Sequence, residues 1–151
     1  MKKILLFLLL GGSALGGLTS CASSSPAAGT YAPARNDDAI IVTLDKEGID
    51  AWTQVAQAMV NRGFSIETGD RSSMTLVSEP KFRNNSVYVR IYAKVIGNAA
   101  RLTGTLADLK PDARQRPVQY KNKKKGSDTI GWSEMMAVAN ELKGPITYDK
   151  R

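Results

Sequence analysis

The stretch SVYVRIYAKVIGNAARLTGTLADL, residues 86–109, decides the fold of this chain. Along 86–96, aliphatic side chains alternate with tyrosine, arginine and lysine, so an extended strand would place the two kinds on opposite faces. GNAA then predicts a turn, and the alternation resumes along 101–109. The stretch therefore predicts two antiparallel strands with one covered face and one solvated face.

The segments before this stretch extend it into a sheet. FSIET (64–68) and SMTLVS (73–78) alternate in the same way, and the turn sequence GDRS between them predicts a hairpin. AIIVTL (39–44) is a short β-branched run of the kind found in buried strands. We therefore expect an antiparallel sheet of about five strands.

Two other segments have the spacing of amphipathic helices. The apolar residues that recur at steps of three and four in the first segment are Ile49, Trp52, Val55, Ala56, Met59 and Val60. In the second segment they are Trp132, Met135, Met136, Ala139 and Leu142. Gly63 follows the first segment, where a left-handed residue typically ends a helix, and Gly144 and Pro145 close the second. Both tryptophans lie on these apolar stripes and are predicted to be core residues.

These elements predict a single α+β domain of two layers over residues 39–151. The expected order is β-α-β-β-β-β-α, with two helices on one face of the antiparallel sheet. Residues 110–128 are polar and contain two prolines, so they predict a long loop before the second helix. The order of elements resembles that of the helix-grip domains of accessory lipoproteins in the outer-membrane β-barrel assembly machinery. This resemblance covers residues 39–149 in element order alone and implies no functional residues.

The first 38 residues are unlike a folded domain. Lys2 and Lys3 precede fifteen uncharged, mainly apolar residues (4–18). This run is shorter than the roughly 20 residues of a membrane-spanning helix and is typical of a secretory signal, which we place at residues 1–20. Residues 22–38 are rich in serine, alanine and proline and lack apolar periodicity, so they predict a flexible tether.

The only cysteine of the chain lies at the end of this signal. Leu18, Thr19, Ser20 and Cys21 resemble the lipobox of bacterial lipoproteins, in which two small residues separate a leucine from the cysteine. The resemblance implies cleavage before Cys21, a diacylglycerol on its thiol and an acyl chain such as palmitate on the new amino group. Residues 21–38 would then be a lipidated cysteine and its tether, held at a membrane by several acyl chains. The alternative is an ordinary signal peptide followed by a free thiol.

The residues after the cysteine indicate which membrane surface to expect. In many Gram-negative bacteria, an aspartate directly after the lipidated cysteine resembles an inner-membrane retention signal. This chain has Ala22 at that position. Residues 22–35 also lack the acidic side chains that resemble a surface-display signal in the Bacteroidetes. Both comparisons favour the periplasmic face of the outer membrane.

The composition excludes several classes of chemistry. The chain has no histidine and one cysteine, so it lacks the ligands of zinc and most transition-metal sites and the partners of Ser-His or Cys-His nucleophiles. The acidic residues are scattered and show no pairing for glycoside hydrolysis. We therefore expect no metal, no cofactor and no enzymatic activity. Without residues 1–20 the chain has 19 Lys and Arg against 14 Asp and Glu, a side-chain charge of +5 that favours anionic partners.

The first candidate binding surface is the solvated face of the strand at 86–96. It carries Tyr88, Arg90, Tyr92 and Lys94, with Arg101 on the next strand. Aromatic rings beside cations can stack on planar or sugar rings while the cations pair with anions. Because the chain is exported, we expect an anionic glycan, a lipid head group or an envelope protein as the partner, and no nucleic acid. The alternative is an ordinary solvated face on which these side chains shield the strands.

The second candidate surface lies in the predicted loop. Between Lys110 and Lys125 the sequence has seven basic residues and one acidic residue, a local charge of +6. Its densest part consists of Lys121, Lys123, Lys124 and Lys125. Near a membrane such a loop could dock on anionic head groups, at about 1 kcal/mol per basic residue. The alternative is a solvated turn whose lysines favour solubility.

The function expected from these features is that of a membrane-anchored envelope lipoprotein acting as a non-enzymatic interaction or structural module. The alternative is a periplasmic lipoprotein that binds a small ligand or an anionic glycan. A pocket lined by valine, methionine and leucine between the first helix and the sheet would favour the ligand-binding alternative. A filled interior would favour the module.

Overall fold

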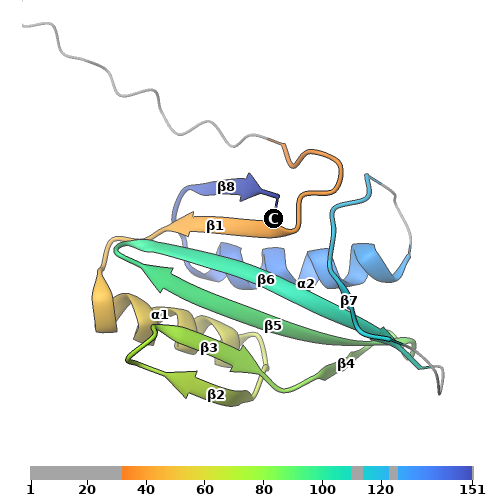
Figure 1. Cartoon of the computed structure of the whole chain (residues 1–151), viewed down its shortest axis with the longest axis horizontal. Coiled ribbons are helices and arrows are strands. Elements are labelled where there is room, and N and C mark those ends of the chain that lie inside the picture. Colours follow the sequence, from red (N-terminus) through yellow and green to blue (C-terminus); the bar gives the residue numbers. More distant parts are fainter. Residues whose placement is uncertain (1–31, 110–113, 123–125, 151) are drawn as a thin grey trace, which may run out of the picture.

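The computed structural model describes residues 32–109, 114–122 and 126–150. In this part of the chain, one antiparallel sheet carries two helices on one face (Figure 1). The helices are α1 (Gly48–Asn61) and α2 (Ser127–Glu141). The strands are β1 (Ala39–Thr43), β2 (Ile66–Asp70), β3 (Thr75–Ser78), β4 (Lys81–Arg83), β5 (Val87–Ile96), β6 (Ala99–Asp108), β7 (Arg116–Pro117) and β8 (Ile146–Asp149). The predicted α+β fold, an antiparallel sheet with two helices packed on it, is confirmed.

The strand order in the sheet is β2-β3-β5-β6-β1-β8, with β4 beside β5 and β7 beside β6. The predicted meander corresponds to β2, β3, β5 and β6, which are successive neighbours in the sheet, although the short β4 lies between β3 and β5 in the sequence. The predicted first strand, β1, pairs with the edge of β6 that faces away from β5, and β8 pairs with the other edge of β1. The structure therefore adds three short strands, β4, β7 and β8, to those that the sequence predicts.

The pairing of β5 with β6 is the longest in the sheet and sets its two faces. It runs without interruption from Val87 opposite Asp108 to Ile96 opposite Ala99. The side chains of β5 that face the helices are each at most 4% exposed: Val87, Val89, Ile91, Ala93 and Val95. The predicted alternation between a covered and a solvated face is thus confirmed.

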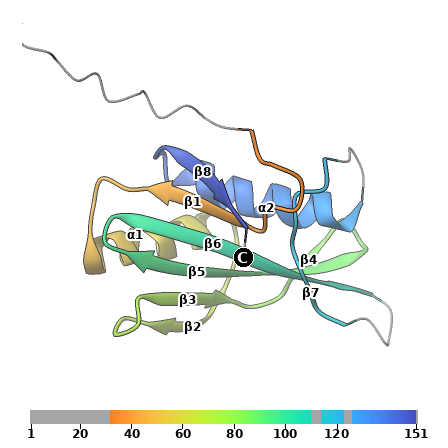
Figure 2. The same cartoon turned by 45° about the horizontal axis from the view of Figure 1, so that its top comes forward.

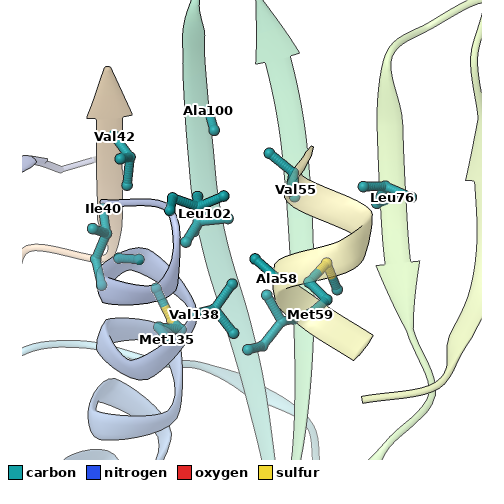
Figure 3. Close-up of a cluster of buried hydrophobic side chains, with 14 of the residues drawn as sticks. Ile40, Val42, Val55, Ala58, Met59, Leu76, Ala100, Leu102, Met135 and Val138 are labelled. Atoms are coloured by element: carbon teal, nitrogen blue, oxygen red, sulfur yellow. The ribbon is translucent and has the colours of Figure 1, made fainter. Parts of the chain in front are cut away.

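Both helices pack on the covered face. α1 lies mainly against β5 and α2 mainly against β6 (Figures 1 and 2). Figure 3 shows Val55 and Met59 of α1 and Met135 and Val138 of α2 on either side of Leu102, a β6 side chain that solvent does not reach. A Cβ atom at Gly131 of α2 would lie 2.7 Å from the Leu106 side chain, so this glycine allows α2 to approach β6 closely.

The buried stripe of α1 differs in part from the predicted stripe. Ile49 and Val60 are 43% and 50% exposed, while Ala51 and Ala58 are buried. The helix thus turns small side chains towards the sheet, which shortens the distance between the two layers. Trp52 is half-buried, and its indole N–H donates to the Thr75 carbonyl at 3.1 Å. The helix ends as predicted, because Gly63 adopts a φ of 74°.

Two of the additional strands lie beside prolines. Pro80, which has no backbone N–H, separates β4 from β3. The gap in the ladder is filled by the Ser78 hydroxyl, which accepts the Ile91 N–H at 3.0 Å. β8 follows Pro145, whose carbonyl accepts the Thr43 N–H at 3.0 Å. Each of these strands completes the edge of a longer neighbour.

The folded domain begins within the segment that the sequence predicts as a tether. The Asn36 N–H donates to the Tyr120 carbonyl, and the Tyr120 N–H donates to the Asp37 carbonyl, both at 2.8 Å. The Asp38 N–H donates to the Asp149 carbonyl at 3.1 Å. Residues 34–38 therefore belong to the domain. We call them the tether root.

An aromatic cluster packs close to the tether root. Trp132 of α2 is 7% exposed, which confirms its predicted place in the core. Its ring centroid lies 5.4 Å from that of Tyr120 and 5.9 Å from that of Tyr148. These contacts join α2 to β8 and to the segment that follows β7, at the point where the chain enters the sheet.

The turn between α2 and β8 requires glycine at position 144, because a side chain there would clash with β1. A Cβ atom at Gly144 would lie 1.9 Å from the Thr43 carbonyl oxygen, which is far inside van der Waals contact. Gly144→Ala should therefore push β8 away from β1 and lower the free energy of unfolding by about 3 kcal/mol, as measured by urea denaturation.

Gly97→Ala is the matched control, because its φ is 58° but no atom lies within 4 Å of the added Cβ. This variant should lose only about 1–2 kcal/mol from the left-handed backbone. Equal losses in the two variants would show that the close approach at Gly144 does not constrain the fold.

Candidate binding surface

The sheet face opposite the helices holds the residue row predicted from the sequence. Tyr88, Arg90, Tyr92 and Lys94 project from β5 on this face, and Arg101 of β6 lies directly opposite Lys94. The structure therefore brings all five predicted residues together on one surface, which we call the open sheet face. Its polar side chains are supported by Thr103 and Thr105 of β6, which pair with Tyr92 and Arg90.

The two arginines of this row are already paired with carboxylates. Arg90 Nη2 lies 3.0 Å from Glu67 Oε2 of β2, and Arg101 Nη1 lies 2.5 Å from Asp149 Oδ2 of β8. Among the described residues, Lys94 is the cation of the row that makes no ion pair. The open sheet face is therefore less cationic than the sequence row alone indicates.

The Arg101–Asp149 pair changes the titration of its carboxyl group. The hydrogen bond from Arg101, and then the one from the Lys150 backbone N–H, hold the pKa of Asp149 below its ordinary value of 3.8. Both side chains are partly exposed to solvent, so the pair mainly fixes the position of the arginine.

A shallow depression lies over the unpaired lysine. It has a volume of about 210 Å³ and is lined by Tyr92, Ala93, Lys94, Arg101 and Thr103. A depression of this size, with one free ammonium group, fits a single side chain or a small polar group better than a large polyanion.

Phe82 extends the open sheet face with a residue that the sequence does not predict there. Phe82 of β4 pairs with Tyr88 of β5, and their ring centroids lie 5.1 Å apart. Each residue is 41% exposed. The only sequence signal is the alternation of Lys81, Phe82 and Arg83 directly after a proline, which is too short to predict a strand. The surface therefore has an aromatic pair at one end and a free lysine further along.

The other predicted sites lie largely elsewhere. Cys21 and Lys123, Lys124 and Lys125 fall outside the described residues. Lys121 is described, and its ammonium donates to the Gln119 side-chain oxygen at 2.6 Å. It follows Tyr120, whose backbone pairs with the tether root, so the basic segment starts beside the point where the chain enters the domain.

One serine and one lysine have the S-x-x-K spacing of a Ser-Lys dyad but are not arranged as one. Ser78 is fully buried, and its hydroxyl donates to the Glu79 carbonyl while accepting the Ile91 N–H. The Lys81 ammonium donates to the Arg62 carbonyl and lies 4.6 Å from the centre of the Phe64 ring. Both groups therefore stabilise the link between α1, β3 and β4.

Two other depressions lie on the helix side of the domain. One, of about 550 Å³, adjoins the turn after α2, and another, of about 370 Å³, lies along α1. Polar and apolar atoms contribute about equally to their walls, which include no valine or methionine side chain, so they differ from the apolar pocket that a ligand-binding core would require. Within the described residues, no group of three or more His, Cys, Asp or Glu could hold a metal ion. Neither helix in this part of the chain is long and apolar enough to cross a membrane.

No protein-family model matches this chain. No curated protein matches it at a significant level.

The Arg101–Asp149 pair makes a testable pH prediction. The pKa of Asp149, measured by NMR, should lie below 3.8 in the natural chain and should rise in Arg101→Ala. Because the folded-state pKa is below the unfolded value, the carboxylate stabilises the fold above pH 3.8, and this contribution is lost as the pH falls through the folded-state pKa. Lys94→Ala, the matched control, should shift Asp149 less. A larger shift in that variant would contradict the assigned pair.

Proposed function

We propose that this chain is a lipid-anchored protein of the bacterial envelope that acts as a non-enzymatic interaction module. The observation that carries the proposal is the Leu18-Thr19-Ser20-Cys21 motif behind a short basic and apolar leader. Two or three acyl chains on the mature N-terminus would hold the protein at a membrane with negligible release. The absence of aspartate at position 22 favours the periplasmic face of the outer membrane.

The geometry of the tether root supports a domain that works close to the lipid surface. Ten residues lie between Cys21 and Ala32, the first described residue, so these two residues can be at most about 36–40 Å apart. Arg35 of the tether root is exposed. In the segments that bond to the tether root, Lys150 is exposed and Lys121 is half-buried. These cations would face anionic head groups, which attract basic residues near the surface.

The open sheet face is the surface that we assign to a partner protein. Exposed aromatic side chains dominate the energetics of many protein interfaces, and Phe82 and Tyr88 form such a pair. Arg90 and Arg101 are held in place by their carboxylates, so they would present hydrogen-bond donors at little further cost in entropy. Lys94 is the one cation of this row that would be available to pair with a polyanion. The surface therefore favours an envelope protein over an anionic glycan.

The interior of the domain supports the module over a small-ligand receptor. Val55 and Met59 of α1, and Val89 and Ile91 of β5, are all 0% exposed. The space between the first helix and the sheet is thus filled by side chains from both layers.

Cys21→Ser tests the lipid anchor. In the host, this variant should lose incorporation of labelled palmitate and should move from the membrane fraction to the soluble fraction, because the thiol that accepts the lipid is gone. Ser24→Ala, which lies three residues beyond the motif, should keep both properties. Undiminished labelling of Cys21→Ser would refute the anchor.

Truncation of the aromatic pair tests the partner surface. Tyr88→Ala and Phe82→Ala should each reduce the yield of a crosslinked envelope partner at least about fivefold, which corresponds to about 1 kcal/mol of binding free energy. Val60→Ala is the matched control, because Val60 is 50% exposed on the opposite side of the domain. The open sheet face would be excluded as the interface if Val60→Ala reduced the yield as strongly as the other two variants.

A further inference from the structure

A groove with both polar and apolar walls runs between α1 and the end of α2. It consists of the two large depressions, about 550 and 370 Å³, which adjoin because Gln54 and Glu141 line both. The combined groove is open to solvent along its length and lies on the opposite side of the domain from the open sheet face. Its size is within the range of sites for small organic ligands.

One wall of the groove is a row of polar side chains along α1. Asp50, Thr53, Gln54, Gln57 and Asn61 recur at steps of three and four and share one helix face. At 1.5 Å per residue, the row from Asp50 to Asn61 is about 16 Å long. The groove is therefore elongated, which suits a chain-like ligand better than a compact one.

Hydrogen bonds across the groove fix the orientation of its amide groups. The Gln57 side-chain nitrogen donates to Asn61 Oδ1 at 2.8 Å, and Asn61 Nδ2 donates to Glu141 Oε1 at 3.1 Å. These two hydrogen bonds join α1 to α2. They leave the Gln57 side-chain oxygen and one Asn61 N–H available to bond a ligand. Oriented side chains of this kind lose little entropy when they bind a ligand.

Gln54 is the least satisfied group on the wall. Its side-chain nitrogen reaches the Leu142 carbonyl only at 3.5 Å, and its Oε1 is shielded from solvent without a hydrogen-bond partner among the described residues. A buried amide oxygen without a partner lowers the stability of the fold, because it has lost its hydrogen bonds to water. Rotation of this amide towards a donor in the groove would remove that cost.

The chemistry of the walls indicates the class of ligand. Asp45, Asp50 and Glu141 nearly balance Lys46 and Lys143, so the groove does not select strongly for an ion. An apolar ligand would desolvate the amides without replacing their hydrogen bonds. An extended peptide typically needs a free strand edge or apolar side-chain pockets, and neither wall of this groove supplies them. Sugar hydroxyls both donate and accept, as the amide side chains do.

We propose that the α1–α2 groove binds a short, uncharged oligosaccharide through Gln54, Gln57, Asn61 and Glu141. This inference goes beyond the proposed function and requires neither the lipid anchor nor the open sheet face. It gives the domain two separate binding surfaces, one on each side.

The experiment is an NMR titration of the whole isotope-labelled protein, purified from its host, with chitotetraose as the probe. The detergent must have a phosphocholine head group, because a sugar head group would compete for the groove. Saturable shifts should occur in the side-chain NH₂ signals of Gln54, Gln57 and Asn61, with a Kd on the order of 1 mM or below. Gln57→Leu should weaken this binding at least about fivefold, which corresponds to about 1 kcal/mol.

Gln115→Leu is the matched control, since Gln115 is exposed and lines neither depression, and its Kd should be unchanged. An unaltered backbone amide spectrum of each variant would show that the fold is intact. The proposal would be overturned by the absence of saturable shifts in the groove up to about 10 mM probe. It would also be overturned by equal shifts with tetra-alanine or by an unchanged Kd in Gln57→Leu.

Discussion

The uninterrupted pairing of β5 with β6 is the constraint on which the rest of this structure depends. Side chains alternate between the faces of a strand, so a slip of one residue would expose Ile91 and bury Arg90 and Lys94. The short turn after Ile96 prevents such a slip by fixing the register. Both helices then pack on the one apolar face that this register creates, and β1 and β3 pair with the two outer sides. The opposite face remains free to carry a partner.

Sequence periodicity could predict the long elements of this fold but not the short ones. The alternation in 86–109 is extended enough to fix two strands and their faces. β4, β7 and β8 have two to four residues each and form because a longer strand already presents unpaired backbone groups. Phe82 was missed for this reason, since its place on the open sheet face depends on the pairing of β4. The tether root was missed likewise, because Asn36 and Asp37 bond to a segment more than 80 residues away.

The electrostatic character of the surfaces was the part least accessible from sequence. The sequence row of tyrosines and cations correctly predicted which side chains share a face. It could not show that Glu67 and Asp149, from two other strands, neutralise both arginines. The same holds for the groove, where Asn61 and Glu141 meet across 80 residues of sequence. Long-range ion pairs and amide contacts follow from topology, which local patterns do not determine.

The position of β1 has a mechanical consequence. The chain enters the sheet at the start of this strand, which is hydrogen-bonded to β6 on one side and to β8 on the other. A pull directed along the strand would load both rows of hydrogen bonds in shear, because these bonds lie perpendicular to an antiparallel strand. Bonds loaded in this way share the force and do not open in succession. The strand through which the chain enters the sheet would thus resist a pull along its own axis.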